Sequence, residues 1–227
     1  MMLLALDTAT QRIGLALHDG NAILSECSWV GGRRQTTELA PEVALMLRRA
    51  GITPRALTGV AVAIGPGAFT GLRIGLALAK GLSLAHNLPL VGVPTLDILA
   101  WGQPRRDEPM LAILHAGRGR VAGVWYKWKA SGWQATSEPE VMTWPELRDR
   151  LEAPTYVCGE VDDEGREVLA AQPKAKLAPP ALSVRRPGVL AEIAWHKLRS
   201  GWDVRPAHRG QLASWWARER RQSRHTP

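Results

Sequence analysis

Closely spaced glycines mark the segment Gly65–Gly75, whose sequence is GPGAFTGLRIG. The segment lies between an apolar run at residues 60–64 and a longer apolar stretch that reaches residue 85. A strand, a glycine-rich turn and a helix in this order can present backbone N–H groups to a phosphate. Arg73 is placed one turn into the helix and could reach the same anion. The residues that would form this phosphate-binding turn are Gly65, Gly67, Thr70 and Gly71.

A second set of polar residues ends the first apolar run of the chain. Asp7, Thr8 and Thr10 follow residues 3–6 directly. A carboxylate followed by hydroxyls can hold a hydrated divalent ion and a phosphate oxygen. The same residue types also stabilise a tight turn through side-chain-to-backbone hydrogen bonds, and the sequence leaves both uses open.

The helix predicted after the glycine turn favours a surface for another protein. Between residues 70 and 85 only four residues are polar, and a helix that is apolar nearly all round must be buried nearly all round. Gly71, Gly75 and Ala79 recur every four residues, a stripe that permits close approach of another backbone. The sequence therefore supports two hypotheses for this segment, a phosphate site and a partner surface.

Other kinds of catalytic site lack support in the sequence. The six histidines show no H-x-x-x-H spacing, and no G-x-S-x-G motif occurs. The consecutive acids at residues 162–164 are typical of a helix N-terminus. No metal site and no catalytic residue is predicted.

Composition indicates a globular protein with a basic end. Of 227 residues, 45% are hydrophobic and 22% are charged, and neither a signal peptide nor a membrane span is expected. Cys27 and Cys158 have no neighbouring cysteine, which favours a reducing, cytoplasmic setting. Residues 197–227 hold eight basic and two acidic residues of a chain with net charge +8. Such a tail either contacts a phosphate-rich partner such as tRNA or is simply solvated.

The first half is predicted to have the element order β-β-β-α-β-α-β, with a mixed sheet and helices packed on it. Thr37 is expected to cap the first helix, Pro41 to lie in its first turn, and Thr95 to cap the third helix. The predicted elements are strands at 3–6, 13–17, 23–30, 60–64 and 88–93, and helices at 37–50, 70–85 and 95–101.

A polar stretch at residues 103–109 predicts a domain boundary, with one unit at 1–103 and a second at 104–227. The second unit could share the β-β-β-α plan of the first. Its predicted elements are strands at 110–115, 121–129, 133–141 and 155–158, and helices at 144–151, 162–171 and 187–198.

Three motifs resemble the TsaB (YeaZ-like) family: LLALDTAT at residues 3–10, the helix start from Arg33 to Pro41, and the Gly65–Gly75 segment. PLVGVPTL at residues 89–96 continues the resemblance, which covers about the first 100 residues well. It implies an α/β fold of the actin-like ATPase (Hsp70/sugar-kinase) type, with duplicated RNase H-like halves and mixed sheets. It also implies a non-catalytic subunit that serves the synthesis of N6-threonylcarbamoyladenosine at position 37 of tRNA.

The resemblance further implies partners: the catalytic paralogue TsaD, the ATPase TsaE and a second copy of the chain, with tRNA bound indirectly or through the tail. No cofactor is expected on this chain alone, and ATP or ADP at the interface of the complex is left open. The partner surface implied by the family consists of Leu39, Val43, Met46, Leu47, Phe69, Arg73, Ile74, Ala77 and Leu78.

Departures from the family pattern bear on the alternative, a nucleotide-binding or ATP-hydrolysing enzyme of the same fold. The family often has Asp-Ala-Arg at the start of the second half, where this chain has His115, Ala116 and Gly117. A missing acidic position weakens the case for independent hydrolysis. Gln35 stands where the family often has histidine. The tail with Trp215, Trp216, Arg218, Arg220 and Arg221 replaces a family Tyr-Leu-Arg.

Overall fold

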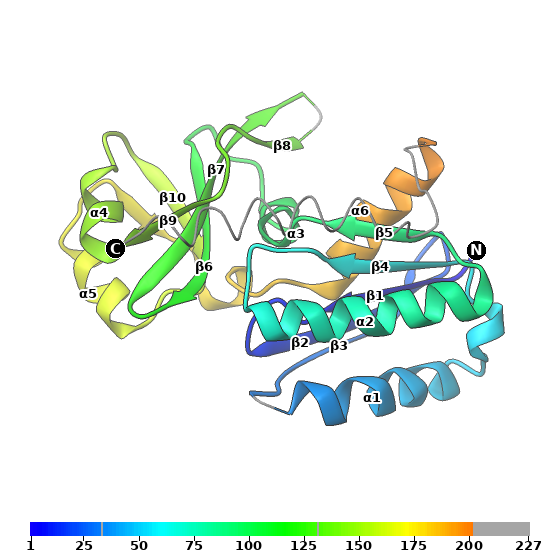
Figure 1. Cartoon of the computed structure of the whole chain (residues 1–227). Coiled ribbons are helices and arrows are strands. Elements are labelled where there is room, and N and C mark those ends of the chain that lie inside the picture. The colour runs from blue at the N-terminus through cyan, green and yellow to red at the C-terminus, as the bar shows by residue number, and fades with distance from the viewer. Residues whose placement is uncertain (33, 131, 202–227) are drawn as a thin grey trace.

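Two mixed β-sheets, each with helices on its faces, make up the computed structural model, which describes residues 1–32, 34–130 and 132–201 (Figure 1). In the first sheet, of order β3-β2-β1-β4-β5, strand β1 is antiparallel to β2 and parallel to β4. Its strands are β1 Leu3–Asp7, β2 Arg12–His18, β3 Ile23–Val30, β4 Gly59–Ala63 and β5 Leu90–Val93.

Helices cover both faces of the first sheet because side chains alternate along its strands. Leu4 and Leu6 of β1 face the helices α1 and α2, whereas Leu3 and Ala5 face α6. The helical elements of this half are α1 Gln35–Arg49, the 3₁₀ turn η1 Pro54–Ala56, α2 Phe69–His86, α3 Thr95–Trp101 and α6 Pro187–Arg199.

The second sheet repeats the plan of the first, with the order β11-β10-β6-β7-β8. Strand β6 takes the place of β1, because it is antiparallel to β7 and parallel to β10. This repetition confirms the expected duplication of two mixed-sheet halves. The remaining elements are β6 Met110–Gly117, β7 Arg120–Lys129, β8 Gly132–Ala135, β9 Glu140–Thr143, α4 Trp144–Asp149, β10 Thr155–Gly159, α5 Asp163–Ala170, β11 Ala175–Leu177 and η2 Pro180–Leu182.

Helix α3 connects the halves in space, and helix α6 returns the chain from the second half to the first. Helix α3 packs Leu96 and Leu99 against the second sheet, whose other face is covered by α4 and α5. Helix α6 follows the second half in the sequence but packs against β1 and β2 (Figure 1). The last described helix therefore belongs with the first sheet, although it lies beyond the boundary predicted at residues 103–109.

Helix starts differ from the predicted ones. Helix α1 begins at Gln35, so Arg34 and not Thr37 holds the cap position. The Thr37 hydroxyl donates to the Arg34 carbonyl. Pro41 therefore lies in the second turn, not the first. Thr95 is the first residue of α3 and Pro94 holds the cap position, while the Thr95 hydroxyl accepts the N–H of Gly65.

The strand predicted at residues 133–141 is interrupted. Strands β8 and β9 both pair with β7, and Tyr126 faces Ala135 while Gly123 faces Glu140. Four residues, 136–139, thus lie opposite two, which is a bulge that also accommodates Pro139, a residue without an N–H for the ladder.

Within the described ranges, no helix has the length and apolar character needed to cross a membrane. The predicted basic tail, with Trp215 and Trp216, lies outside the described residues, as does Arg33 of the family motif.

Candidate functional site

The polar residues at the end of β1 lie where the two halves meet. The Asp7 carboxylate accepts the N–H of Ala9 at 2.9 Å and Nε of Arg185 at 2.9 Å. The Thr8 hydroxyl donates to the carbonyl of Gly71 at 2.7 Å. Side-chain-to-backbone bonds therefore do stabilise this turn, and its carboxylate already has a cationic partner.

Arg185 is the centre of a buried network. Its guanidinium donates from Nε to Asp7, from Nη1 to Glu160 at 2.9 Å and from Nη2 to the Thr10 hydroxyl at 2.7 Å. Thr10 in turn donates to Glu160 at 2.7 Å. Only 3% of the Arg185 side chain is exposed, so all three of its nitrogens exchange water for protein acceptors.

The charges of this network support one another. Burial lowers the pKa of Arg185, but the nearby Asp7 and Glu160 carboxylates outweigh burial and raise it. Burial raises the pKa of Glu160, but the Arg185 guanidinium, the His115 N–H and the Thr10 hydroxyl together outweigh burial and lower it. Both side chains therefore carry full charge at neutral pH, which is the condition for a strong ion pair.

The glycine turn packs against the chain itself. A Cβ on Gly67 would collide with the Ala9 carbonyl, and a Cβ on Gly71 would collide with the Thr8 carbonyl. The N–H of Ala68 donates to the Ala9 carbonyl at 2.6 Å. The turn therefore seats α2 on the end of β1, which accounts for its glycines without a phosphate.

The stripe of small residues on α2 also faces inward. A Cβ on Gly75 would collide with the Thr8 hydroxyl, and Ala79 lies in the core between the first sheet and its helices. The expectation that Gly71, Gly75 and Ala79 admit a partner helix is wrong, because the close approach is to β1 of the same chain.

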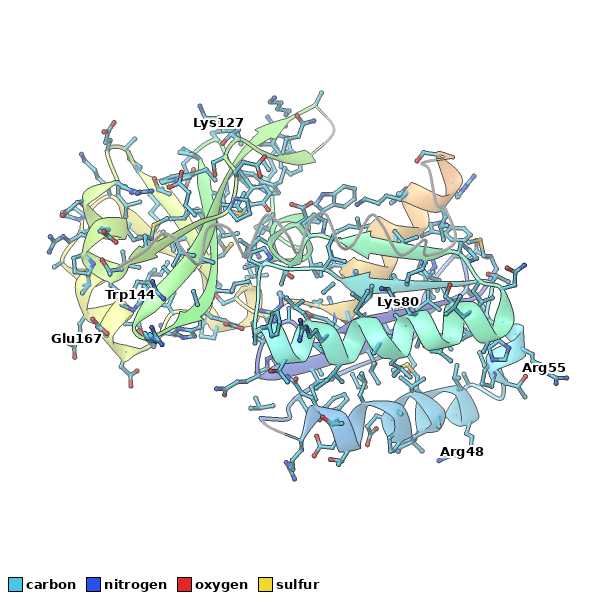
Figure 2. All side chains as sticks on the ribbon, viewed as in Figure 1. Arg48, Arg55, Lys80, Lys127, Trp144 and Glu167 are labelled. Atoms are coloured by element: carbon cyan, nitrogen blue, oxygen red, sulfur yellow. The ribbon has the colours of Figure 1, made fainter. Side chains whose placement is uncertain are left out.

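A different side of α2 is open to solvent. Phe69 is 46% exposed and Leu84 is 74% exposed, and Ala77 lies between them on the same helical face. The Arg73 guanidinium stacks 3.6 Å from the Phe69 ring centroid. Lys80, which Figure 2 labels on α2, completes this face, called here the outer α2 stripe: Phe69, Arg73, Ala77, Lys80 and Leu84.

The predicted partner residues of α1 are not on the surface. Leu39, Val43, Met46 and Leu47 are between 1% and 5% exposed and form part of the core between the first sheet and its helices. Ile74 and Leu78 are half-buried and pack against the same core. Of the predicted interface, only Phe69, Arg73 and Ala77 are exposed.

Sequence reasoning missed Glu160 and Arg185 of the network, and it gave Gln35 no contact with it. Glu160 follows β10 directly, and an acid at the carboxyl end of a parallel strand is a usable signal. Gln35 donates to the Thr10 carbonyl at 2.7 Å, which links α1 to the network. Arg185 lies 178 positions from Asp7 in a proline-rich segment, and nothing local marks it.

The end of β6 lacks the acid that the family often has there, but Glu160 is close to that position. The backbone N–H of His115 donates to Glu160 at 3.0 Å, and the His115 ring lies 3.8 Å from Asp162. Asp162 caps α5, as the helix N-terminal interpretation predicted. Across residues 1–32, 34–130 and 132–201, no cluster of three His, Cys, Asp or Glu side chains could hold a metal ion.

Comparison with known sequences finds similarity in a region that includes α1 and α2. The family model described as TsaD: tRNA N6-adenosine threonylcarbamoyltransferase matches residues 30–146. The tRNA threonylcarbamoyladenosine biosynthesis protein TsaB of Escherichia coli (strain K12) is 36% identical over 152 residues, or 65% of this chain. The match spans 64% of that relative's length, which is less than two thirds.

Solved structures share the arrangement of both halves. YeaZ from Pseudomonas aeruginosa is 27% identical, has a TM-score of 0.70, and the match covers 88% of this chain and 95% of that one. The activator of the 2-hydroxyisocaproyl-CoA dehydratase from Clostridium difficile, solved with bound ADPNP, is 9% identical and has a TM-score of 0.54, and the match covers 88% of this chain and 96% of that one. The latter shows fold alone, and the fold is that of the actin-like ATPases, as expected.

Proposed function

Because the chain belongs to the family of the tRNA N6-adenosine threonylcarbamoyltransferase model, and within it is a TsaB-family protein, we propose that it is a non-catalytic subunit in threonylcarbamoyladenosine synthesis on tRNA. It docks the catalytic paralogue TsaD and stabilises its active form. The observation that carries this proposal is the outer α2 stripe, an exposed helix face with a large apolar side chain at each end and two cations between them.

The chemistry of the stripe suits a protein partner. Phe69 and Leu84 lie at its two ends and would lose water on docking, which is the main source of favourable free energy in such contacts. Arg73 and Lys80 are its charged members, and the stripe has no acid. A partner surface with apolar side chains and carboxylates is therefore expected, and a second copy of the chain would compete for the same face.

The non-catalytic role is supported by the pairing of Asp7. In an ATP-hydrolysing enzyme of this fold, an acid at this position would be expected to hold a hydrated cation beside the phosphates. Here the Asp7 carboxylate is instead paired with the Arg185 guanidinium, at 2.9 Å. TsaE and tRNA remain expected further partners of the complex, with tRNA reached through TsaD or through the basic tail, in a cytoplasmic setting.

Co-purification with the cognate TsaD tests the docking surface. Ala77→Glu places a charge in the centre of the stripe without touching the core, and we expect it to abolish the complex at micromolar concentration. Ile74 is a poorer probe, because it packs against the chain's own core.

The matched control is Ala170→Glu at the exposed end of α5, which should leave the complex intact. Circular dichroism confirms that both variants are folded. Complex formation by Ala77→Glu at wild-type affinity would show that the stripe is not the docking surface.

A further inference from the structure

One side chain connects the two halves of the molecule. Arg185 binds Asp7 and Thr10 of the first half through Nε and Nη2, and it binds Glu160 of the second half through Nη1. Thr10 adds a direct hydrogen bond to Glu160 across the same boundary. The three acceptors are spaced so that a single planar guanidinium satisfies all of them at once.

Because this contact is buried, its hydrogen bonds tolerate little change in the positions of their partners. The Arg185 side chain is 3% exposed and that of Asp7 is 4% exposed, so water contributes little to their solvation. Separating the halves would take Glu160, whose side chain is 23% exposed, away from the guanidinium and leave its carboxylate without a cationic partner. A small rotation of one half would therefore break a charge-assisted hydrogen bond before any replacement could form.

Two further polar contacts cross the same joint. Gln103 donates to the carbonyls of Leu99 and Leu182 and accepts the hydroxyl of Tyr156 at 3.0 Å. Asp97 of α3 accepts the hydroxyl of Tyr126 of β7 at 2.7 Å. Both contacts lie beside the apolar packing of α3 on the second sheet, so they restrain the same motion as Arg185.

We infer that Arg185 holds the two halves in one fixed relative orientation. Its guanidinium lies between Asp7 and Glu160 and supplies there the positive charge that a bound cation would supply. This orientation then needs no nucleotide, and a nucleotide does not change it. This inference goes beyond the docking role, because it concerns the free chain and holds whatever partner binds.

The distance between two spin labels, measured by pulsed electron paramagnetic resonance, tests whether the two halves keep one relative orientation. The labels are placed at Arg48→Cys on α1 and Glu167→Cys on α5, two exposed positions that Figure 2 labels on opposite halves. Cys27 is changed to Ser, and the fully buried Cys158 is kept. We expect one narrow distance distribution, unchanged when Mg-ATP is added in excess.

Arg185→Met should replace this narrow peak by a broad distribution. The matched control is Arg186→Met, because Arg186 is the next residue and is also paired, but with Glu26 of the first half and at the surface. The control should keep the wild-type distribution. Glu160→Gln, which removes the charge on the second half while keeping the side-chain shape, should broaden the peak as Arg185→Met does.

The outcomes separate clearly. A broad or two-peaked distribution in the wild-type chain, or a shift of its peak on adding Mg-ATP, overturns the inference. So does a folded Arg185→Met or Glu160→Gln variant with the wild-type peak. Where neither variant folds, the wild-type measurement with and without Mg-ATP decides. A failed TsaD co-purification leaves all of these readouts unaffected, so the two proposals fail independently.

Discussion

The Nε atom of Arg185 lies 2.9 Å from Oδ2 of Asp7, although the two residues are 178 positions apart in the chain. The contact joins the end of β1 to the segment that leads into α6. Asp7, which has the position of a possible cation ligand, is therefore one member of an internal ion pair. The chain has the fold of the actin-like ATPases, but the polar residues where its halves meet bind one another.

Loss of the guanidinium should cost much of the stability of the protein. We expect Arg185→Met to lower the free energy of unfolding by about 3–5 kcal/mol, because it leaves buried carboxylates unpaired. Arg186→Met removes an exposed pair and should cost at most about 1 kcal/mol. Urea unfolding followed by circular dichroism measures both, and equal losses would contradict the special role of Arg185.

The free energy of unfolding should fall at low pH, because Glu160 becomes protonated there. Its pKa in the folded protein is lowered from the ordinary value of 4.5, so its contribution is fully present above that value and is lost as the pH falls through the lowered folded value. Urea titrations at a series of pH values should show a steeper acid loss in the wild type than in Glu160→Gln. Parallel curves for the two proteins would argue against this assignment.

Two glycines of the same helix should respond to alanine in opposite directions. Gly71→Ala forces a Cβ against the Thr8 carbonyl and should destabilise the protein by about 1–3 kcal/mol. Gly81→Ala meets nothing within 4 Å and should stabilise it by up to about 1 kcal/mol, because alanine is the better helix former. Thermal unfolding of the two variants checks the direction of each change, and a stabilising Gly71→Ala would refute the close packing of α2 on β1.

Gln103 should be energetically coupled to Tyr156. Gln103→Leu leaves the buried Tyr156 hydroxyl without its acceptor, which should cost about 1–3 kcal/mol for each polar group left unpaired. Adding Tyr156→Phe removes that hydroxyl, so the double variant should lose less stability than the two single losses combined. Additive losses in a double-mutant cycle would show that the hydrogen bond contributes little.

Regular elements were predictable because their signals are local. The repeated spacing of apolar residues placed α2 and α3 to within a residue of their observed ends, and Gly51 ends α1 with a φ of 69°. The start of α1 was not predictable in this way, because Gln35 is held by the carbonyl of Thr10, which lies 25 residues earlier. The bulge between β8 and β9 likewise depends on pairing with β7.

The sequence by itself determined the helices and strands of an α/β protein and the position of Asp7 and the glycine turn, since periodicity, strand-end residues and glycine spacing are properties of neighbouring residues. The duplication of the two halves was implied by the family resemblance. Only the tertiary structure decided what these groups do. It brought Arg185 to Asp7, turned the Gly71 and Gly75 side of α2 toward Thr8 and left Phe69 and Leu84 exposed. The physical reason is that burial and ion pairing depend on which segments, far apart in the sequence, come into contact. No pattern among neighbouring residues encodes those contacts.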